Sequence, residues 1–267
     1  MIKTFRRLAV LMGLASPLAC AYPAYDAQMP NGSQFHLVGS IHMGTRGMSP
    51  LPSALLKQIE NSDGLIVEVD ITKPISFNSP DDYPHLEQRL SSAEYQALIE
   101  RCHSLGLDID SIVYKPGWHA ALALQAMQAS HNGLHSEYGI DYQVIQAAYN
   151  MDIPVIELEG ADRQMQLLTQ IANNGIPLLQ DSLAHWQDND EIMQIMIDWW
   201  LAEKTKPQEL NLPYGMSGDL YNLLITGRNT LWNQQLTAYP KGKYVVVVGA
   251  LHLYGDNNLP DLLNASR

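Results

Sequence analysis

Short apolar runs alternate with longer stretches of helical periodicity along the chain. Four of the runs end at glycine or at polar residues, which predicts strands, and Gly64–Val69 among them is rich in β-branched residues. These runs are Phe35–Val38, Gly64–Val69, Ile153–Leu158 and Tyr244–Val248. Stretches with apolar positions three and four residues apart predict helices. They are Leu51–Asn61, Ser91–Leu105, Trp118–His131, Ile140–Asn150, Ala161–Ile171, Leu178–Glu203 and Ser217–Ala238.

The order of these elements predicts an α/β fold with a mixed or largely parallel central sheet. The first strand, helix and strand favour a parallel βαβ unit, and the helical middle of the chain favours an insertion or cap on the sheet. We expect Trp199, Trp200 and Trp232 to pack in that cap. Lys204–Pro213 is polar and holds two prolines, which predicts a loop. No break in composition marks a boundary, so the sequence predicts a single domain over residues 22–267.

The amino terminus has the pattern of a secretory signal peptide. Lys3, Arg6 and Arg7 precede the apolar run Leu8–Ala19, and small residues follow it, which predicts cleavage after Ala21. The apolar run has 12 residues, fewer than the roughly 20 of a membrane-spanning helix. We therefore expect residues 1–21 to be a signal peptide and the protein to be periplasmic or secreted.

Two alternatives for this segment stay open. One is a tail or anchor that is not cleaved. The other is a lipoprotein acylated at Cys20, although Pro17 and Leu18 match that signal poorly.

Composition and charge exclude several classes of protein. The 267 residues are 46% hydrophobic, which is too apolar for a disordered chain. Two cysteines, Cys20 and Cys102, are too few for a disulfide scaffold, and we interpret Cys102 as a buried thiol. The formal charge of −12, which becomes −15 without Lys3, Arg6 and Arg7, argues against nucleic acid as a partner. No later run of 18 apolar residues predicts a membrane span, so we expect a soluble mature chain.

The same motif, G-x-x-H, follows two of the predicted strands. Gly39 and His42 follow the first strand, and Gly249 and His252 follow the last. Glycine lets the backbone turn sharply and approach a ligand closely. If both strands are parallel and central, the two histidines meet at the carboxyl edge of the sheet, where ligands usually bind. A lone histidine after a strand is more often structural, and the shared motif is what singles out this pair.

The other histidines lack such a context, and we interpret them as structural or surface residues: His36, His85, His103, His119, His131, His135 and His185.

Carboxylates are expected at the same edge of the sheet. Glu68 and Asp70 lie at the end of one predicted strand, and Glu157 and Glu159 at the end of another, with Glu159 the more inward of that pair. Two imidazoles and a carboxylate suit a divalent transition metal that keeps positions open for water or substrate. Without a metal, the histidines could act as general base and acid. The usual zincin, zinc-ribbon, serine-hydrolase and P-loop motifs are absent from the sequence.

Two further pairs of residues are candidates. Asp141 and Tyr142 open a predicted helix, where Asp141 could simply complement the helix amino terminus. Arg228 and Asn229 lie in the last long helix, and Arg228 could hold a carboxylate, a substrate anion or a surface partner.

Six segments together resemble the TraB/GumN family, most closely its small bacterial members. They are LVGSIHMG, IVEVD, EYGIDYQVIQAA, VIELEG, GRNTLW and VVVVGALHLYG, and the resemblance covers about Ala24 to Leu263. The family is similar to the Tiki proteins, which are metal-dependent proteases, and more remotely to erythromycin-esterase and haem-binding ChaN-like folds. The resemblance implies an α/β fold with two related halves and an active site between them.

On this resemblance His42, His252 and Glu68 are the expected metal ligands, and the metal implied is manganese or cobalt. Zinc is a further candidate. Together with Arg228 the three ligands form the expected catalytic set, in which Glu68 is either a ligand or the general base. Around this set we expect substrate-binding or supporting residues, namely Asp70, Asp141, Tyr142, Glu159 and Asn229.

The leading hypothesis is therefore a secreted metal-dependent hydrolase of the peptidase type, acting on a peptide or a small molecule. One alternative is a non-catalytic peptide binder, since TraB-type members are linked to shutting down peptide pheromone signals. Another is a metal-free esterase or a haem binder.

Overall fold

The structure, a computed structural model, describes residues 22–74, 82–201 and 218–266. The predicted signal peptide and the predicted loop Lys204–Pro213 lie outside these ranges.

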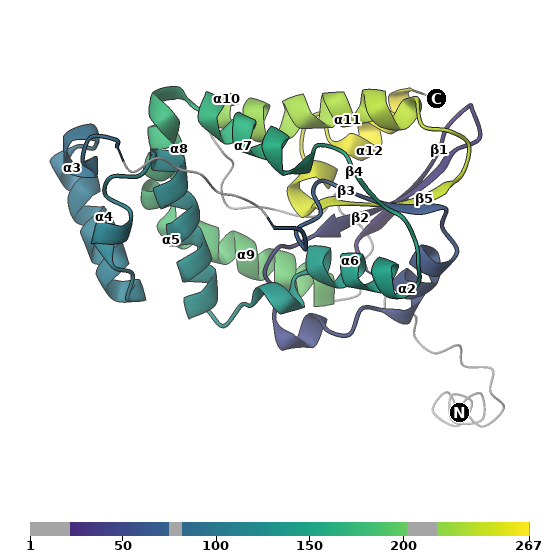
Figure 1. Cartoon of the computed structure of the whole chain (residues 1–267), viewed down its shortest axis with the longest axis horizontal. Helices are drawn as coiled ribbons and strands as arrows, with labels where there is room; N and C mark the ends of the chain where they lie inside the picture. The colour runs from purple at the N-terminus through teal and green to yellow at the C-terminus, as the bar shows by residue number, and fades with distance from the viewer. Residues whose placement is uncertain (1–21, 75–81, 202–217, 267) are drawn as a thin grey trace, which may run out of the picture.

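A five-stranded sheet forms the centre of the fold, with the strand order β1-β2-β5-β3-β4 (Figure 1). The strands are β1 (Ala24–Gln28), β2 (Gln34–Ser40), β3 (Gly64–Val67), β4 (Val155–Glu157) and β5 (Lys243–Gly249). Only β1 runs antiparallel to its neighbour, and the other three pairings within the sheet are parallel. The predicted α/β fold with a largely parallel sheet is confirmed.

The two strands that carry G-x-x-H lie side by side in the middle of the sheet. Gly39 pairs with Val248, and Ser40 pairs with Gly249, so the strands end level with each other. Strand β5 is buried from Tyr244 to Val248, as its run of β-branched residues predicts. Both histidine loops therefore leave the sheet at the same edge, as expected for parallel central strands.

Helices cover both faces of the sheet (Figure 1). On one face lie α2 (Ser53–Glu60) and α6 (Ile140–Asn150), which contact the strands and each other. On the opposite face lie α11 (Gly227–Thr237) and α12 (Leu259–Ala265), and α12 contacts β1. The prediction for Ile140–Asn150 is confirmed at both ends.

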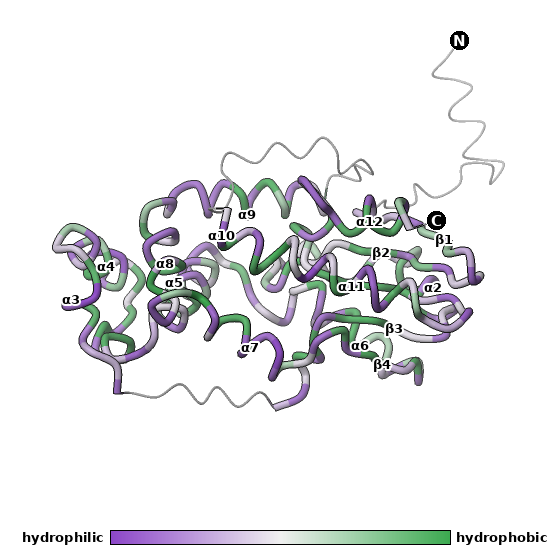
Figure 2. Tube along the Cα trace, turned by 90° about the horizontal axis from the view of Figure 1, so that it is seen from above, coloured by the Kyte–Doolittle hydropathy of each residue, from purple (hydrophilic) through white to green (hydrophobic). Residues whose placement is uncertain are grey.

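The remaining long helices build a cap with its own apolar cluster, which includes Leu98, Leu124 and Leu179. Its members are α3 (Leu86–Arg89), α4 (Ser92–Leu105), α5 (Gly117–His131) and α8 (Ala172–Ala184). Between the cap and the sheet lies α7 (Gly160–Gln170), as two perpendicular views show (Figure 1 and Figure 2). Ser91 and Glu94 form the predicted capping box of α4, and Gly106 ends that helix in the left-handed region.

The tryptophans pack against the sheet, which corrects the expectation that they pack in the cap. Trp199 and Trp200 belong to α9 (Trp186–Leu201), and together with Trp232 they lie in the apolar cluster that surrounds the strands. The indole N–H of Trp200 donates to the carbonyl of Gly39 at 2.8 Å, which ties α9 to the end of β2.

Two observed strands end at other residues than predicted, and local contacts explain one of the differences. The strand predicted over Gly64–Val69 ends at Val67, because the carbonyl of Glu68 turns away to accept the N–H groups of Glu159 and Gly160. The strand predicted over Ile153–Leu158 shortens to β4.

The two longest predicted helices are also divided. Leu178–Glu203 becomes α8 and α9, and Ser217–Ala238 becomes α10 (Gly218–Tyr221), a π turn (Asn222–Thr226) and α11. Short 3₁₀ turns complete the fold at Arg46–Met48, Ile109–Ser111, Ser136–Tyr138 and Ala250–Leu253. Within the described ranges, the helices are all too short or too polar to cross a bilayer.

Gly139 allows the closest backbone approach around α6, and its substitution is a test of this fold. A Cβ added at Gly139 would lie 2.1 Å from the carbonyl oxygen of His42. Gly139→Ala is expected to lower the free energy of unfolding by about 1–3 kcal/mol, because the two backbones must move apart. Chemical denaturation measures the change. The matched control is Gly218→Ala, where an added Cβ meets nothing within 4 Å, and it is expected to be neutral or slightly stabilising. Equal losses in both variants would contradict the packing described.

Candidate functional site

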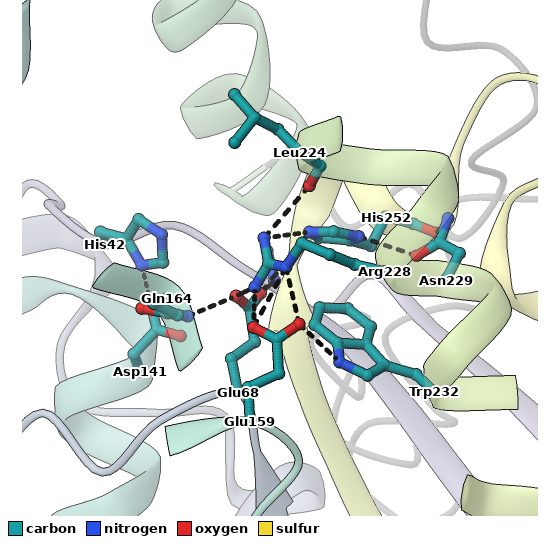
Figure 3. A network of polar contacts seen from close by, with 11 residues as sticks. His42, Glu68, Asp141, Glu159, Gln164, Leu224, Arg228, Asn229, Trp232 and His252 are labelled. Atoms are coloured by element: carbon teal, nitrogen blue, oxygen red, sulfur yellow. Dashed lines mark hydrogen bonds and ion pairs between the residues drawn. The ribbon is translucent and has the colours of Figure 1, made fainter. Parts of the chain in front are cut away.

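The carboxyl ends of all four parallel strands converge on one cluster of polar side chains (Figure 3). His42 follows β2, Glu68 follows β3, Glu159 follows β4 and His252 follows β5. Arg228 enters from α11 and lies between the two glutamates. The edge of the sheet thus brings together residues that are up to 210 positions apart in the sequence (252 minus 42).

Arg228 uses each of its five N–H donors. The Nε group donates to both carboxylate oxygens of Glu159, at 3.0 and 3.1 Å. One terminal nitrogen donates to Glu159 at 2.9 Å and also to Glu68. The other donates to the carbonyl of Leu224 at 3.2 Å and contacts Nε2 of His252 at 3.2 Å. The guanidinium is therefore fixed in one orientation and has no donor left for a substrate anion.

The π turn before α11 supplies part of this arrangement. Its hydrogen bond from the N–H of Gly227 to the carbonyl of Asn222 spans five residues instead of four. A Cβ at Gly227 would lie 2.8 Å from that carbonyl oxygen, so the turn requires glycine here. The carbonyl of Leu224 within this turn accepts the side chain of Arg228.

Glu68 is buried and stays ionised. Its Oε1 accepts the N–H of Gly249 at 2.6 Å, and its Oε2 accepts Arg228 and the amide of Gln164 at 3.2 Å. Burial by itself would raise the pKa of Glu68, but Arg228, the two neighbouring histidines and the N–H of Gly249 together outweigh it and lower the pKa to about 2. A Cβ at Gly249 would lie 3.3 Å from Oε1 of Glu68, so the glycine lets the carboxylate come close to the backbone here.

His252 is buried and neutral. Its Nδ1 lies 2.7 Å from the side-chain oxygen of Asn229, whose amide nitrogen donates to the carbonyls of His252 and Asn257. This orientation of Asn229 assigns the proton to Nδ1 and leaves Nε2 as an acceptor for Arg228. Burial, with Arg228 nearby, lowers the pKa of His252 to about 3. His252 therefore acts here as a neutral acceptor.

His42 lies in the opposite environment. Its side chain is 71% exposed, and its Nδ1 lies 2.8 Å from Oδ2 of Asp141, a carboxylate that is 10% exposed in the first turn of α6. Asp141, with a smaller contribution from Glu68, raises the pKa of His42 to about 9. His42 is thus the histidine of the pair that solvent can reach, and its Nε2 is the nitrogen that Asp141 leaves free.

Asp70 belongs to a separate network next to the site. Its buried carboxylate accepts the hydroxyl groups of Thr72 and Tyr149 and lies 3.4 Å from Lys73, which also pairs with Glu157. The carboxylates of Glu68 and Asp70 therefore do not share a site, although alternation places them on one face of an ideal strand.

The other candidate residue of α6, Tyr142, is 38% exposed beside Asp141. Its hydroxyl makes no hydrogen bond within the part of the chain that the structure describes.

The three side chains expected to bind a metal are not arranged to do so in this structure. Arg228 contacts Nε2 of His252 and Oε2 of Glu68, so a fixed positive charge stands between two of the three expected ligands. The third, His42, pairs with Asp141 through Nδ1 and keeps Nε2 available, so it would be a single ligand on its own. Among the described residues, the histidines, cysteines and carboxylates form no group of three arranged to hold a metal ion.

Sequence reasoning missed two side chains of this cluster. Gln164 in α7 donates to Glu68, and the indole N–H of Trp232 donates to Glu159 at 3.1 Å. Trp232 also lies under the guanidinium of Arg228, with 4.6 Å between the guanidinium carbon and the ring centre. The four-residue spacing from Arg228 to Trp232 could have indicated that the two side chains lie together, because residues four apart share one side of a helix.

Comparisons with known proteins point to one family. Residues 27–266 match the TraB/PrgY/gumN family. A protein of Escherichia coli (strain K12) named "Uncharacterized protein YbaP" is 44% identical over 243 residues, which are 91% of this chain and 92% of that protein. The protein of the same name from Shigella flexneri has the same identity and coverage. No solved structure gives a significant match.

Removal of Arg228 tests how much the fold depends on this cluster. Arg228→Ala leaves two buried carboxylates, Glu68 and Glu159, without their cation. We expect a loss of about 3–5 kcal/mol in the free energy of unfolding, because an uncompensated buried charge is costly. Urea denaturation of Arg228→Ala and of the exposed-site control Arg46→Ala measures this difference. The control is expected to stay within about 0.5 kcal/mol of the unaltered protein. A similarly small change for Arg228→Ala would contradict the assignment.

Proposed function

Because the chain belongs to the TraB/PrgY/gumN family, we propose that the strand-end site is catalytic and that His42 acts there as the general base of a hydrolase. The observation that carries the proposal is the pairing of an exposed imidazole with a nearly buried carboxylate, Asp141. The resemblance to hydrolase families supports the reaction class, and the substrate would be a peptide or an ester.

The chemistry follows from the hydrogen bond between His42 and Asp141. Asp141 accepts the proton on Nδ1, which fixes the ring and leaves Nε2 to take a proton from water. The resulting hydroxide attacks the carbonyl carbon of the substrate and forms a C–O bond. The proton on Nε2 then passes to the leaving nitrogen or oxygen as its bond to carbon breaks. Asp141 stabilises the imidazolium between the two transfers.

The buried cluster supports this cycle through its charge. Two glutamates and one arginine sum to −1, with His252 neutral. Glu68 raises the pKa of His42 through its charge, so the cluster favours the imidazolium that forms when His42 takes a proton. In this proposal Glu68, Glu159 and Arg228 are positioning residues.

The expectations of a divalent metal and of export stay predictions. A metal at His252 and Glu68 would require Arg228 to leave both residues, and no step above is routed through one. Cleavage after Ala21 concerns residues outside the described part of the chain.

One observation favours binding without turnover as a second candidate. Arg228 has no free donor, so it offers nothing to the negative charge that develops on a carbonyl oxygen during attack. A binder would protect a peptide in proportion to its own concentration, whereas an enzyme consumes substrate in large excess.

Turnover by His42 variants tests the proposal directly. We expect the unaltered protein to hydrolyse a member of a peptide and acyl-ester library in excess over its own concentration. His42→Ala is expected to lower kcat by about 10²–10⁴-fold, because general-base catalysis is lost. The matched control is His103→Ala, which removes an exposed histidine of α4 and should keep full activity. Stoichiometric protection without turnover would instead establish the binder.

The dependence of kcat on pH gives an independent check. The base form of His42 is the neutral imidazole, which predominates only above its pKa of about 9. We therefore expect kcat to rise with pH and to level off above about 9. Asp141→Asn removes the charge that raises the pKa, so the rise should move down towards the ordinary value of 6.5.

A control for this shift is Asp188→Asn. Asp188 lies 3.0 Å from Nδ1 of His185 in a similar pair in the first turn of α9, and its loss should leave the pH profile unchanged. An unshifted profile for Asp141→Asn would remove His42 from the role of base.

A further inference from the structure

The space between the ends of β3, β4 and β5 holds a cation that belongs to the chain itself. We propose that the guanidinium of Arg228 is the resident cation of this site, in the place that the resemblance assigns to a divalent metal, and that His252 is the residue that positions it. This inference is independent of the proposed hydrolysis, because it concerns only what occupies the site.

The first argument is the geometry of the contacts around Arg228. Its terminal nitrogens lie against Nε2 of His252 and against Glu68, two of the three groups expected to coordinate a metal. Glu159, a further carboxylate, accepts from two nitrogens of the same guanidinium. An imidazole nitrogen and carboxylate oxygens are ordinary ligands of zinc, cobalt and manganese. Here the same types of donor surround an organic cation.

The second argument is the way in which His252 is prepared for this contact. Asn229 accepts the proton on Nδ1, and its own amide is held by two backbone carbonyls, so the ring presents its lone pair at Nε2. A neutral imidazole can accept from a guanidinium, whereas a protonated one would repel it. His252 is 3% exposed, so water does not compete for Nε2. Asn229 and His252 thus form a chain of contacts that ends on Arg228.

The third argument is the packing on the faces of the guanidinium. Trp232 lies under it at 4.6 Å and also lies against the ring of His252, with 4.4 Å between the ring centres. An aromatic face suits a flat, weakly hydrated cation such as guanidinium. A small divalent ion would leave the indole face without this contact.

The first experiment uses the unaltered protein after treatment with a chelator. Zn²⁺ or Co²⁺ is added while NMR records the ¹⁵N signals of the imidazole ring of His252. We expect a neutral ring protonated at Nδ1, with signals that do not change on addition of metal. Stoichiometric binding of one ion per chain that shifts or broadens these signals would overturn the proposal. His42→Ala, measured in parallel, separates this site from metal held by the exposed imidazole.

The second experiment removes the cation. Arg228→Ala should take up about one Co²⁺ per chain, seen as new visible absorption and as a rise in the melting temperature, because Glu68, Glu159 and His252 then lack a cation and can move together around the ion. Arg228→Lys keeps a positive charge and should bind none. A folded Arg228→Ala variant that binds no metal would overturn the claim that Arg228 fills a metal position. If that variant does not fold, the measurement on the unaltered protein decides alone.

Discussion

The ion pairs of Arg228 with Glu68 and Glu159 are the interaction on which the site depends. They join the ends of β3 and β4 to α11 and, through His252, to the end of β5. Buried ion pairs often add little net stability, because desolvation offsets the attraction between the charges. Their effect here is to fix positions, since a guanidinium with five satisfied donors allows one arrangement of the strand ends.

Two histidines from the same sequence motif have opposite properties because their surroundings differ. His252 is enclosed, faces a guanidinium and is neutral, whereas His42 is exposed, faces the carboxylate of Asp141 and has a raised pKa. Environments that push two pKa values apart separate the roles of otherwise equal groups. The buried histidine thus organises the cluster, and the exposed one is free to exchange protons with a ligand.

Much of this arrangement could be predicted from the sequence, because the strongest patterns are local. The apolar runs of β2 and β5 and the glycine after each placed both histidines at one edge of the sheet. The separation of Glu68 from Asp70 could not be predicted, since it depends on the turn after Val67 and on Tyr149 from a distant helix. Likewise β1 is a short edge strand whose pairing is set by β2 and has no strong pattern of its own.

The π turn at Asn222–Thr226 also bears on how this chain can vary in length. An α-helix turns by about 100° per residue, so an insertion or deletion within α11 would rotate Arg228 away from the strand ends. The wide turn already holds one residue more than an α-helical turn. A deletion there could close the helix into regular α form while α11 keeps its direction. Among natural chains of this architecture, loss of a residue at this turn should therefore keep the direction of α11 but remove the Leu224 carbonyl from Arg228, whereas loss of a residue one turn later should rotate Arg228 itself out of the site.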